Sequence, residues 1–457
     1  MRRNTQFVVD NNAKPVWHPM AHPADMRDNP PTVIVAADGV HVTDVNGHRV
    51  LDGVGGLWNV NLGYSCEPIK AAISRQLDVL PYYSGFRGTS TDTAIELAHE
   101  LVEFFAPEAM VRTFFTSGGS DSVESALRIS RQYWKVRGQR DRTKFIGLKR
   151  GYHGTHFGAA SVNGNANFRR NYEPLLPGVF HIPSPFTYRN PFGEPDPVRL
   201  ARLCANALED EIVFQGPDTV AAFIMEPVLG AGGVIVPPET FMPLVRQICD
   251  KYEILLIADE VITGFGRTGA WTGSRLWGVK PDMMTIAKAV TNGYFPLGAA
   301  MISEKVAQVM ESNTDSFGAI YHGYTYSGHP VGCAAGLATL EETARLKVNE
   351  NAAARGITLA DGIAGLMARH EIVGDVRSQG LMAAIELVSD RTSKTPVDKK
   401  TPLKIADAAF KAGVMIRVSG NTIILSPPLI VTDEDVKTMI DAVDAALASV
   451  RPESPKA

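Results

Sequence analysis

Residues 254–289, ILLIADEVITGFGRTGAWTGSRLWGVKPDMMTIAKA, contain two short apolar runs separated by a polar, glycine-rich segment. The first run, Ile254–Ala258, ends directly before Asp259, and the second, Met283–Ala287, ends directly before Lys288. Short apolar runs bounded by polar loops are typical of buried parallel strands. In open α/β sheets, ligands bind outside the carboxyl ends of the strands. We therefore expect Asp259 and Lys288 to face one crevice from neighbouring strands.

An acid and a lysine in one crevice indicate a particular chemistry. The amine of Lys288 could form a Schiff base with a carbonyl compound. Asp259 could keep the pyridine nitrogen of pyridoxal phosphate protonated, so that the ring withdraws electrons from a carbanion. A third apolar run, Ala221–Met225, ends directly before Glu226, so we expect this acid to follow a buried strand as well.

The composition excludes several classes of protein. The 457 residues, 45% of them hydrophobic, are enough for two domains with a large core. The net charge is −4 and there is no basic run, so we expect no nucleic-acid partner. No apolar stretch approaches transmembrane length, and the N-terminus lacks the apolar segment of a secretory signal. These features predict a protein that does not enter a membrane.

The cysteines are widely separated and none belongs to a CxxC pair; they are Cys66, Cys204, Cys249 and Cys333. This spacing predicts neither a zinc site nor a disulfide framework, and we expect no bound metal. A reducing, cytoplasmic setting is the default for such a chain.

A second candidate site element lies in residues 113–138, TFFTSGGSDSVESALRISRQYWKVRG, which combine a strand-like run, a glycine turn and a helical pattern. Free N–H groups and the positive end of the helix dipole would meet at Ser117–Ser120, which favours phosphate as the ligand. An ordinary helix with Ser120 as its N-cap is the alternative. Tyr152 follows another strand-like run, Phe145–Leu148, and either stacks on a flat cofactor ring or packs in the core.

Other segments give weaker signals. Residues 1–37 are polar and dotted with prolines, which predicts an extended arm. Trp58 lies in a glycine-rich loop, GVGGLWNVNLGY, where it either lines a binding site or fills the core. Residues 161–215 are rich in loop signals, and we expect them to form a surface excursion.

The chain divides into three predicted units. Residues 1–65 form the N-terminal arm and strands of a small domain, and residues 66–334 form a large cofactor-binding domain. From 335 the composition shifts towards Ala, Leu and Glu, and residues 335–457 form the C-terminal part of the small domain. The last helix, Thr432–Val450, opens with Thr432 and Asp435 as a candidate capping box.

Gly264–Gly269 reads GFGRTG and matches the GxGxxG pattern of dinucleotide sites. Such a site requires a helix to begin at the glycines. The following residues, AWTGSRLWGVKPD, have no clear helical period. The pattern therefore disfavours a nicotinamide or flavin site, and we expect a loop that shapes the crevice.

Taken together, the motifs resemble those of the fold-type I, class III (omega) aminotransferases, which use pyridoxal phosphate. The resemblance runs from PVWHPM to SPPL and is most specific in FTSGGSDSVESALR, GYHGTH, FIMEPVLGAGG, LLIADEVITGFGRTG, MTIAKAVTNGYFPLGA and YTYSGHP. The chain is most similar to the omega-amino acid or amine:pyruvate branch. The family fold is α/β, with a mainly parallel seven-stranded sheet flanked by helices in the large domain. Its smaller α+β domain is built from the N-terminal segment and the C-terminal part.

The resemblance implies roles for residues around the cofactor ring. Lys288 would be the Schiff-base lysine and proton carrier, and Asp259 would pair with the pyridine nitrogen. Val261 and Tyr152 would pack against the two faces of the ring, and Glu226 would be the acid beside it.

The resemblance also implies contacts to the phosphate and the substrate. Gly119 and Ser120 would hold the phosphate, with Thr325 of the partner subunit. SGGSDS replaces the commoner SGSEA pattern in this turn, so the individual phosphate contacts stay open. Arg417 would bind the carboxylate of the acceptor, although a surface salt bridge is its alternative role, and Trp58 would form a wall of the substrate pocket.

The expected function is ping-pong transamination. The amino group of an omega-amino acid, a taurine-like compound or a primary amine would pass to pyruvate and give alanine. The family builds its site at a subunit interface, which implies a homodimer or a dimer of dimers. A decarboxylase, racemase or aminomutase on the same fold is the alternative, and an NAD-dependent dehydrogenase using GFGRTG is a more distant one.

Overall fold

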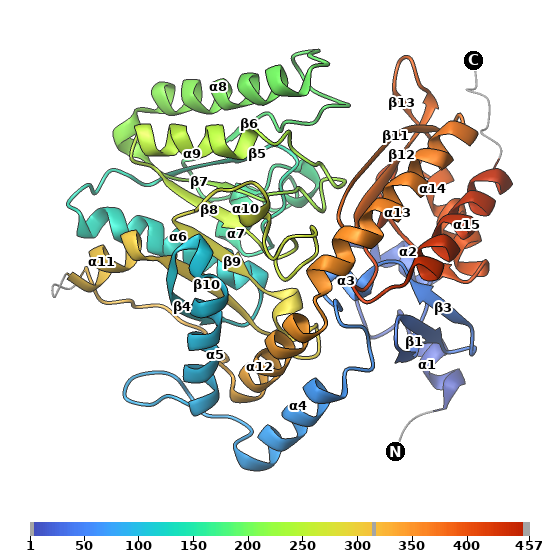
Figure 1. The fold of residues 1–457 in the computed structure, drawn as a ribbon, viewed down its shortest axis with the longest axis horizontal. Helices are drawn as coiled ribbons and strands as arrows, with labels where there is room; N and C mark the ends of the chain where they lie inside the picture. The colour runs from blue at the N-terminus through green and yellow to red at the C-terminus, as the bar shows by residue number, and fades with distance from the viewer. Residues whose placement is uncertain (1–3, 313–316, 451–457) are drawn as a thin grey trace.

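A computed structural model describes residues 4–312 and 317–450 of the chain. Small parts of all three predicted units, residues 1–3, 313–316 and 451–457, lie outside the described residues. The division at 65 and 334 stays a prediction, and the second of these boundaries falls within helix α12 (Pro330–Arg345). Figure 1 shows a large α/β body beside a smaller part in which the blue N-terminal strands lie next to the orange-to-red C-terminal helices and strands.

The large body is built on a seven-stranded sheet, which confirms the predicted fold class. The order is β4 (Met110–Thr116), β10 (Gly298–Ser303), β9 (Met283–Ile286), β8 (Leu255–Asp259), β7 (Val220–Met225), β5 (Lys144–Leu148) and β6 (Val179–Ile182). The strands from β9 to β6 are parallel, and β10 runs antiparallel to both of its neighbours.

Successive side chains of the strands enter two separate cores, one on each face of the sheet. On β7, Phe223 and Met225 belong to one core, whereas Ala222 and Ile224 belong to the other. This alternation explains the continuous apolar runs in the sequence, because both faces of a sandwiched parallel sheet are buried. The first core packs against α5 (Asp92–Phe104), α8 (Pro197–Gln215), α9 (Phe241–Lys251) and α12. The second packs against α6 (Gly119–Val136), α7 (Phe157–Val162) and α11 (Glu304–Ser312).

Two smaller sheets form the other part of the molecule. One joins the N-terminal strands β1 (Ile34–Asp38), β2 (His41–Asp44) and β3 (Arg49–Asp52) to β14 (Val414–Met415) from near the other end of the chain. In the parallel pairing of β3 with β14, Leu51 lies opposite Val414 and Asp52 lies opposite Met415. The other has the order β11 (Val373–Gln379), β12 (Met382–Asp390), β16 (Thr422–Leu425) and β15 (Arg417–Ser419), with β13 (Thr395–Pro396) beside β12. Helices α13 (Val348–Arg369), α14 (Thr401–Lys411) and α15 (Asp433–Ser449) cover these sheets (Figure 1). The predicted capping box of α15 is confirmed by the reciprocal hydrogen bonds of Thr432 and Asp435.

Two sequence predictions about loops were wrong. The N-terminal arm is not simply extended, because it contains two short helices, α1 (Thr5–Asn11) and α2 (Pro23–Asp28). Residues 161–215 are not only a loop excursion, because the segment includes β6 and the 19-residue helix α8. In both α2 and α8 a proline is the first helical residue, where its missing N–H costs no hydrogen bond. The prolines therefore mark helix starts and not breaks.

The GFGRTG loop ties the two parts of the molecule together. No long helix begins at Gly264–Gly269, and the next one, α10 (Gly273–Leu276), has four residues. Arg267 is fully buried and donates hydrogen bonds to the carbonyls of Leu381 and Pro427 and to Oδ1 of Asn61. A buried guanidinium that binds three distant segments links them structurally. The GFGRTG segment is therefore a structural loop, and no helix begins at its glycines as a dinucleotide site would require.

The part of the chain that the structure describes contains neither a membrane-spanning helix nor a group of metal-binding side chains. Among residues 4–312 and 317–450, no helix combines the length and apolarity needed to cross a bilayer. Within the same ranges, no three His, Cys, Asp or Glu side chains are grouped so as to hold a metal ion. All four cysteines are free and buried.

Candidate active site

The carboxyl ends of β8 and β9 place the two charged residues of residues 254–289 in one cavity. In the parallel pairing of these strands, Asp259 lies opposite Thr285, and Lys288 follows three residues later. A cavity of about 340 Å³ is lined by both residues and by Glu226, which follows β7. Its size is in the range of small-molecule and cofactor sites.

The carboxylate of Asp259 is buried and held by three neighbours. Oδ1 accepts hydrogen bonds from the Thr285 hydroxyl at 3.0 Å and from the Val261 N–H at 3.2 Å. Oδ2 lies 2.8 Å from Nδ1 of His153, whose side chain is also buried. Because a carboxylate oxygen can only accept, Nδ1 carries the shared proton. These contacts fix the orientation of the carboxylate and stabilise its negative charge inside the protein.

Lys288 is placed so that its amine loses its proton more easily than a surface lysine. Burial lowers the pKa of Lys288, the acids Asp259 and Glu226 oppose this shift, and Arg417 adds to it. Its backbone has φ of 50°, in the left-handed region, at the start of the 3₁₀ turn Lys288–Thr291. Strained backbone of this kind persists where the surrounding structure holds it, and it is concentrated at functional sites.

Glu226 is fully enclosed and tied to two loops. Its Oε2 accepts a hydrogen bond from the Tyr152 N–H at 2.9 Å, and Oε1 accepts one from the Gly230 N–H at 3.0 Å. Burial raises the pKa of Glu226 to about 7, with a further contribution from Asp259, while His153 and the two N–H groups oppose the shift. The acid can therefore gain or lose a proton near neutral pH.

The predicted phosphate turn forms one end of the same cavity. Ser117, Gly118, Gly119 and Ser120 line it, and Gly119 is the first residue of α6, with Gly118 and not Ser120 as the N-cap. The first N–H groups of a helix have no partner within the helix. Together with the helix dipole they make an anion site at this end of the cavity.

A second, larger cavity of about 760 Å³ opens from the first. Lys288, Tyr152 and Ile262 line both. Trp58 and Arg417 line the larger one, with further aromatic side chains from Phe157, Phe168 and Tyr172. Trp58 is nearly completely buried and also packs in a small apolar cluster. It therefore both lines a cavity and fills part of the core, the two roles that the sequence left open.

Nine of the ten site residues singled out from the sequence line these two cavities, and Thr325 does not. The cavity-lining residues are Trp58, Gly119, Ser120, Tyr152, Glu226, Asp259, Val261, Lys288 and Arg417. The carbonyl of Thr325 instead accepts a hydrogen bond from the Tyr82 hydroxyl on an exposed loop.

Comparison with known proteins agrees with this geometry. The sequence profile of the family described as "Aminotransferase class-III" matches residues 23–447. The chain belongs to the class III aminotransferases. It is 38% identical to a putrescine–pyruvate aminotransferase of Pseudomonas aeruginosa, over 89% of this chain and 88% of that one. It is 36% identical to a diaminobutyrate–2-oxoglutarate transaminase of Halomonas elongata, over 97% and 96% of the two chains.

A solved structure is also similar along nearly the whole chain. An amine transaminase from an uncultivated Pseudomonas species, determined with pyridoxal phosphate bound, has 47% identity and a TM-score of 0.94, covering 95% of this chain and 98% of that one. The protein is therefore an aminotransferase that depends on pyridoxal phosphate. The observed side chains fit this cofactor, because one cavity combines an amine, a buried carboxylate and the free N–H groups of a helix.

Two residues that contact Asp259, His153 and Thr285, were not predicted from the sequence to have a role in the site. His153 lies within the motif GYHGTH, which follows a predicted strand, so its position could have been recognised from the sequence. The prediction named only its neighbour Tyr152, as the aromatic residue. Thr285 lies inside an apolar strand, and only the strand register shows that its hydroxyl reaches Asp259. No pattern in the sequence reveals that register.

We expect Glu226 to make the stability of the cofactor-free protein depend on pH. The folded state raises its pKa to about 7 from an unfolded value near 4.5, so the folded protein binds the extra proton. This contribution to stability is fully present below pH 4.5 and is lost as pH rises through 7, by about 3 kcal/mol in total. Glu226→Gln should flatten the curve of thermal midpoint against pH between 5 and 7 and raise the midpoint at pH 8.

The matched control for this variant is Glu239→Gln, which changes an exposed carboxylate. It should leave the slope of the curve as in the parent protein. A Glu226→Gln variant with the parental slope would contradict the raised pKa of Glu226.

Proposed function

We propose that this aminotransferase moves the amino group of a primary amine, an omega-amino acid or a taurine-like compound to pyruvate. The observation that carries the proposal is the shared cavity wall: Lys288 and Tyr152 line both the cofactor cavity and the larger cavity that contains Arg417. A donor or acceptor in the larger cavity would therefore lie next to the amine that handles its proton.

The residues of the first cavity would hold the cofactor in a defined orientation. The free N–H groups at the start of α6 would bind its phosphate, and Asp259 would hold a proton on its ring nitrogen. When bound, pyridoxal phosphate supplies an electrophilic aldehyde carbon and an electron-withdrawing ring. Lys288 Nζ would hold that aldehyde carbon and, once released as a neutral amine, would remove the proton from the amine-bearing carbon of the donor. The lowered pKa of Lys288 favours the neutral form.

Arg417 supports a carboxylate-bearing acceptor. Burial lowers the pKa of its guanidinium, and among the described residues no carboxylate pairs with it. A partly buried guanidinium without an acid partner can bind a carboxylate in a two-pronged geometry. The other basic side chains that line the larger cavity are Lys288 and His22. One guanidinium fits one carboxylate, which favours pyruvate over a dicarboxylate such as 2-oxoglutarate.

The walls of the larger cavity support a donor with a carbon chain or ring. Leu57, Trp58, Phe157, Phe168 and Tyr172 give it a largely apolar and aromatic surface. Such a surface excludes water and gains free energy from each methylene group that it covers, about 0.8 kcal/mol for full burial. It does not select one donor by itself.

A second copy of the chain would complete the site. Large apolar side chains are exposed in residues 82–95 and 317–326, namely Tyr83, Phe86, Ile95, Phe317, Ile320, Tyr321 and Tyr326. Tyr321 has 81% of its surface exposed. An exposed patch of this kind marks an interface. Thr325 lies inside it and away from its own cofactor cavity, in keeping with a contact to the phosphate of a partner subunit.

Replacing Lys288 should remove the chemistry. We expect Lys288→Ala to reduce turnover by at least about 1,000-fold, because among the described residues Lys288 is the one lysine that lines the two cavities. Borohydride treatment of the parent protein, followed by peptide mapping, should show the cofactor attached to residue 288. Lys280→Ala, which changes an exposed lysine, is the control and should keep full activity and labelling. Cofactor fixed at another residue would refute the assignment.

Replacing Arg417 should separate the two substrates. Arg417→Leu should raise KM for pyruvate by about 10- to 100-fold, the loss of a charged hydrogen-bonded pair, and leave KM for an amine without a carboxylate nearly unchanged. The rate of alanine formation gives both KM values. One alanine formed for each donor molecule consumed also distinguishes transamination from decarboxylation or racemisation. The parent protein should use pyruvate at least about tenfold more efficiently than 2-oxoglutarate. The reverse preference would refute pyruvate as the acceptor.

Light scattering should give a mass of two or four times 49.4 kDa for the parent protein. Placing charges in the patch, Ile320→Asp with Tyr321→Asp, should give monomers that bind the cofactor more weakly, since the partner's Thr325 is lost. Ile357→Asp, on an exposed position of α13, is the matched control and should leave the mass unchanged. A monomeric parent protein would rule out the proposed assembly.

A further inference from the structure

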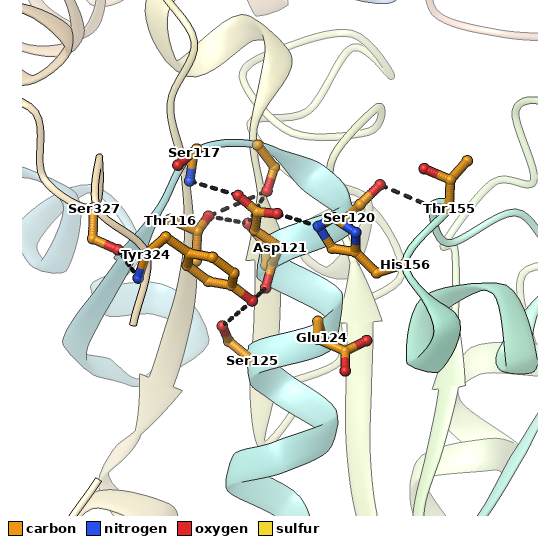
Figure 2. Close-up of polar contacts among 12 residues, drawn as sticks. Thr116, Ser117, Ser120, Asp121, Glu124, Ser125, Thr155, His156, Tyr324 and Ser327 are labelled. Atoms are coloured by element: carbon orange, nitrogen blue, oxygen red, sulfur yellow. Dashed lines mark hydrogen bonds and ion pairs between the residues drawn. The ribbon is translucent and has the colours of Figure 1, made fainter. Parts of the chain in front are cut away.

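The phosphate turn is fastened to the loop that carries Tyr152 by two polar contacts, shown in Figure 2. Ser120 Oγ accepts a hydrogen bond from the Thr155 N–H at 3.1 Å, and Oδ1 of Asp121 contacts Nε2 of His156. The two segments approach so closely that a side chain at Gly154 would lie 2.5 Å from Ser120 Oγ. The turn and the loop therefore hold each other in place at the cofactor cavity.

Asp121 shapes the turn without lining the cavity. Its Oδ2 accepts a hydrogen bond from the Ser117 N–H at 3.0 Å, so that this N–H is no longer free for a phosphate. Its carbonyl accepts one from the Tyr324 hydroxyl at 3.2 Å. The N–H groups of Gly119 and Ser120, which make no such bonds among the described residues, are left as the donors for the anion. The Ser120 hydroxyl, already accepting from Thr155, can add its own proton.

The position of Asp121 creates an electrostatic conflict. A carboxylate in the first turn stabilises a helix through the helix dipole, but it also repels an anion bound at the same helix end. The cofactor phosphate carries close to two negative charges at neutral pH. The next acid along the helix, Glu124, lies 3.6 Å from Arg128, whereas Asp121 meets His156. In Figure 2 the imidazole of His156 lies against the Asp121 carboxylate at the start of α6.

We propose that His156 is a positioning residue for the cofactor phosphate. It binds the Asp121 carboxylate and, together with the Ser117 N–H, fixes it in the turn, so that the carboxylate does not turn towards the phosphate. This inference rests on the proposed phosphate site at residues 117–120. It assigns to His156 and Asp121 a role in cofactor retention, and neither residue touches the reacting atoms.

A double-variant experiment on cofactor binding tests the proposal. Cofactor-free protein is titrated with pyridoxal phosphate, and the dissociation constant and dissociation half-time are measured from the cofactor absorbance. His156→Ala should weaken binding about tenfold, because the Asp121 carboxylate loses the partner that fixes it beside the anion. Asp121→Asn should bind as tightly as the parent, because the amide oxygen still accepts from Ser117. The double variant Asp121→Asn with His156→Ala should recover most of the affinity, which a loss of packing would not allow.

Further measurements separate this role from a general loss of structure. At saturating cofactor, kcat and KM for the amine should stay close to those of the parent in all three variants. His370→Ala removes a similar contact to Asp444 in the small domain and should leave cofactor affinity unchanged. If His156→Ala does not fold, His156→Asn, which keeps a neutral hydrogen-bond donor, takes its place and should show a smaller loss that Asp121→Asn again reverses.

Two outcomes would overturn the proposal. One is a His156 variant that retains the cofactor as tightly as the parent, and the other is a double variant that binds more weakly than the single one. Failure of the proposed function looks different, because the parent protein would then bind the cofactor but form no alanine from pyruvate and an amine.

Discussion

The parallel pairing of β8 with β9 is the constraint on which the active site depends. Its register sets Asp259 opposite Thr285, so that the hydroxyl of one strand binds the carboxylate of the other at 3.0 Å. The same register places Lys288 three residues after the position opposite Asp259, just beyond the end of β9. A shift by one residue would turn the Thr285 hydroxyl to the opposite face of the sheet and leave a buried carboxylate short of a donor. Burial of apolar side chains on both faces opposes such a shift.

Burial and the charged groups of the cavity have opposing effects on the pKa of Lys288, and the net effect favours the neutral amine that amine chemistry needs. Two acids, Asp259 and Glu226, favour a charged Lys288, while burial and Arg417 favour the neutral amine, and burial is the larger effect. The hydrogen bonds to Asp259 from Thr285, Val261 and His153 hold its charge in place. Glu226 has fewer compensating contacts, and burial raises its pKa to about 7. One cavity thus contains an acid with a well-compensated charge, an acid that titrates near neutral pH and a base that loses its proton readily.

The sequence predicts those parts of the site that depend on where strands end. Asp259, Lys288 and Glu226 each follow a short apolar run, and parallel strands bring such residues to one edge of a sheet. Contacts that depend on register or on folding back of loops have no such signal, as the bonds of Thr285 to Asp259 and of His156 to Asp121 show. Prolines led to a wrong prediction, because Pro23 and Pro197 lie in proline-rich segments that were predicted to be an extended arm and a surface excursion. Each is in fact the first residue of a helix.

The larger cavity is lined by both parts of the molecule, since Lys288 follows β9 of the large sheet and Arg417 begins β15 of the five-stranded sheet. A substrate whose carboxylate binds Arg417 while its amine-bearing carbon meets Lys288 therefore requires a fixed spacing between the two sheets. The buried Arg267 links the two parts, because it lies in the loop after β8 of the large sheet and donates hydrogen bonds to the carbonyls of Leu381 and Pro427 and to Asn61 outside that sheet. Breaking them would leave a charge and several carbonyls unpaired in the interior, which is costly. The GFGRTG loop thus fastens the large sheet to the segments around the five-stranded sheet, and the larger cavity is lined by residues from both.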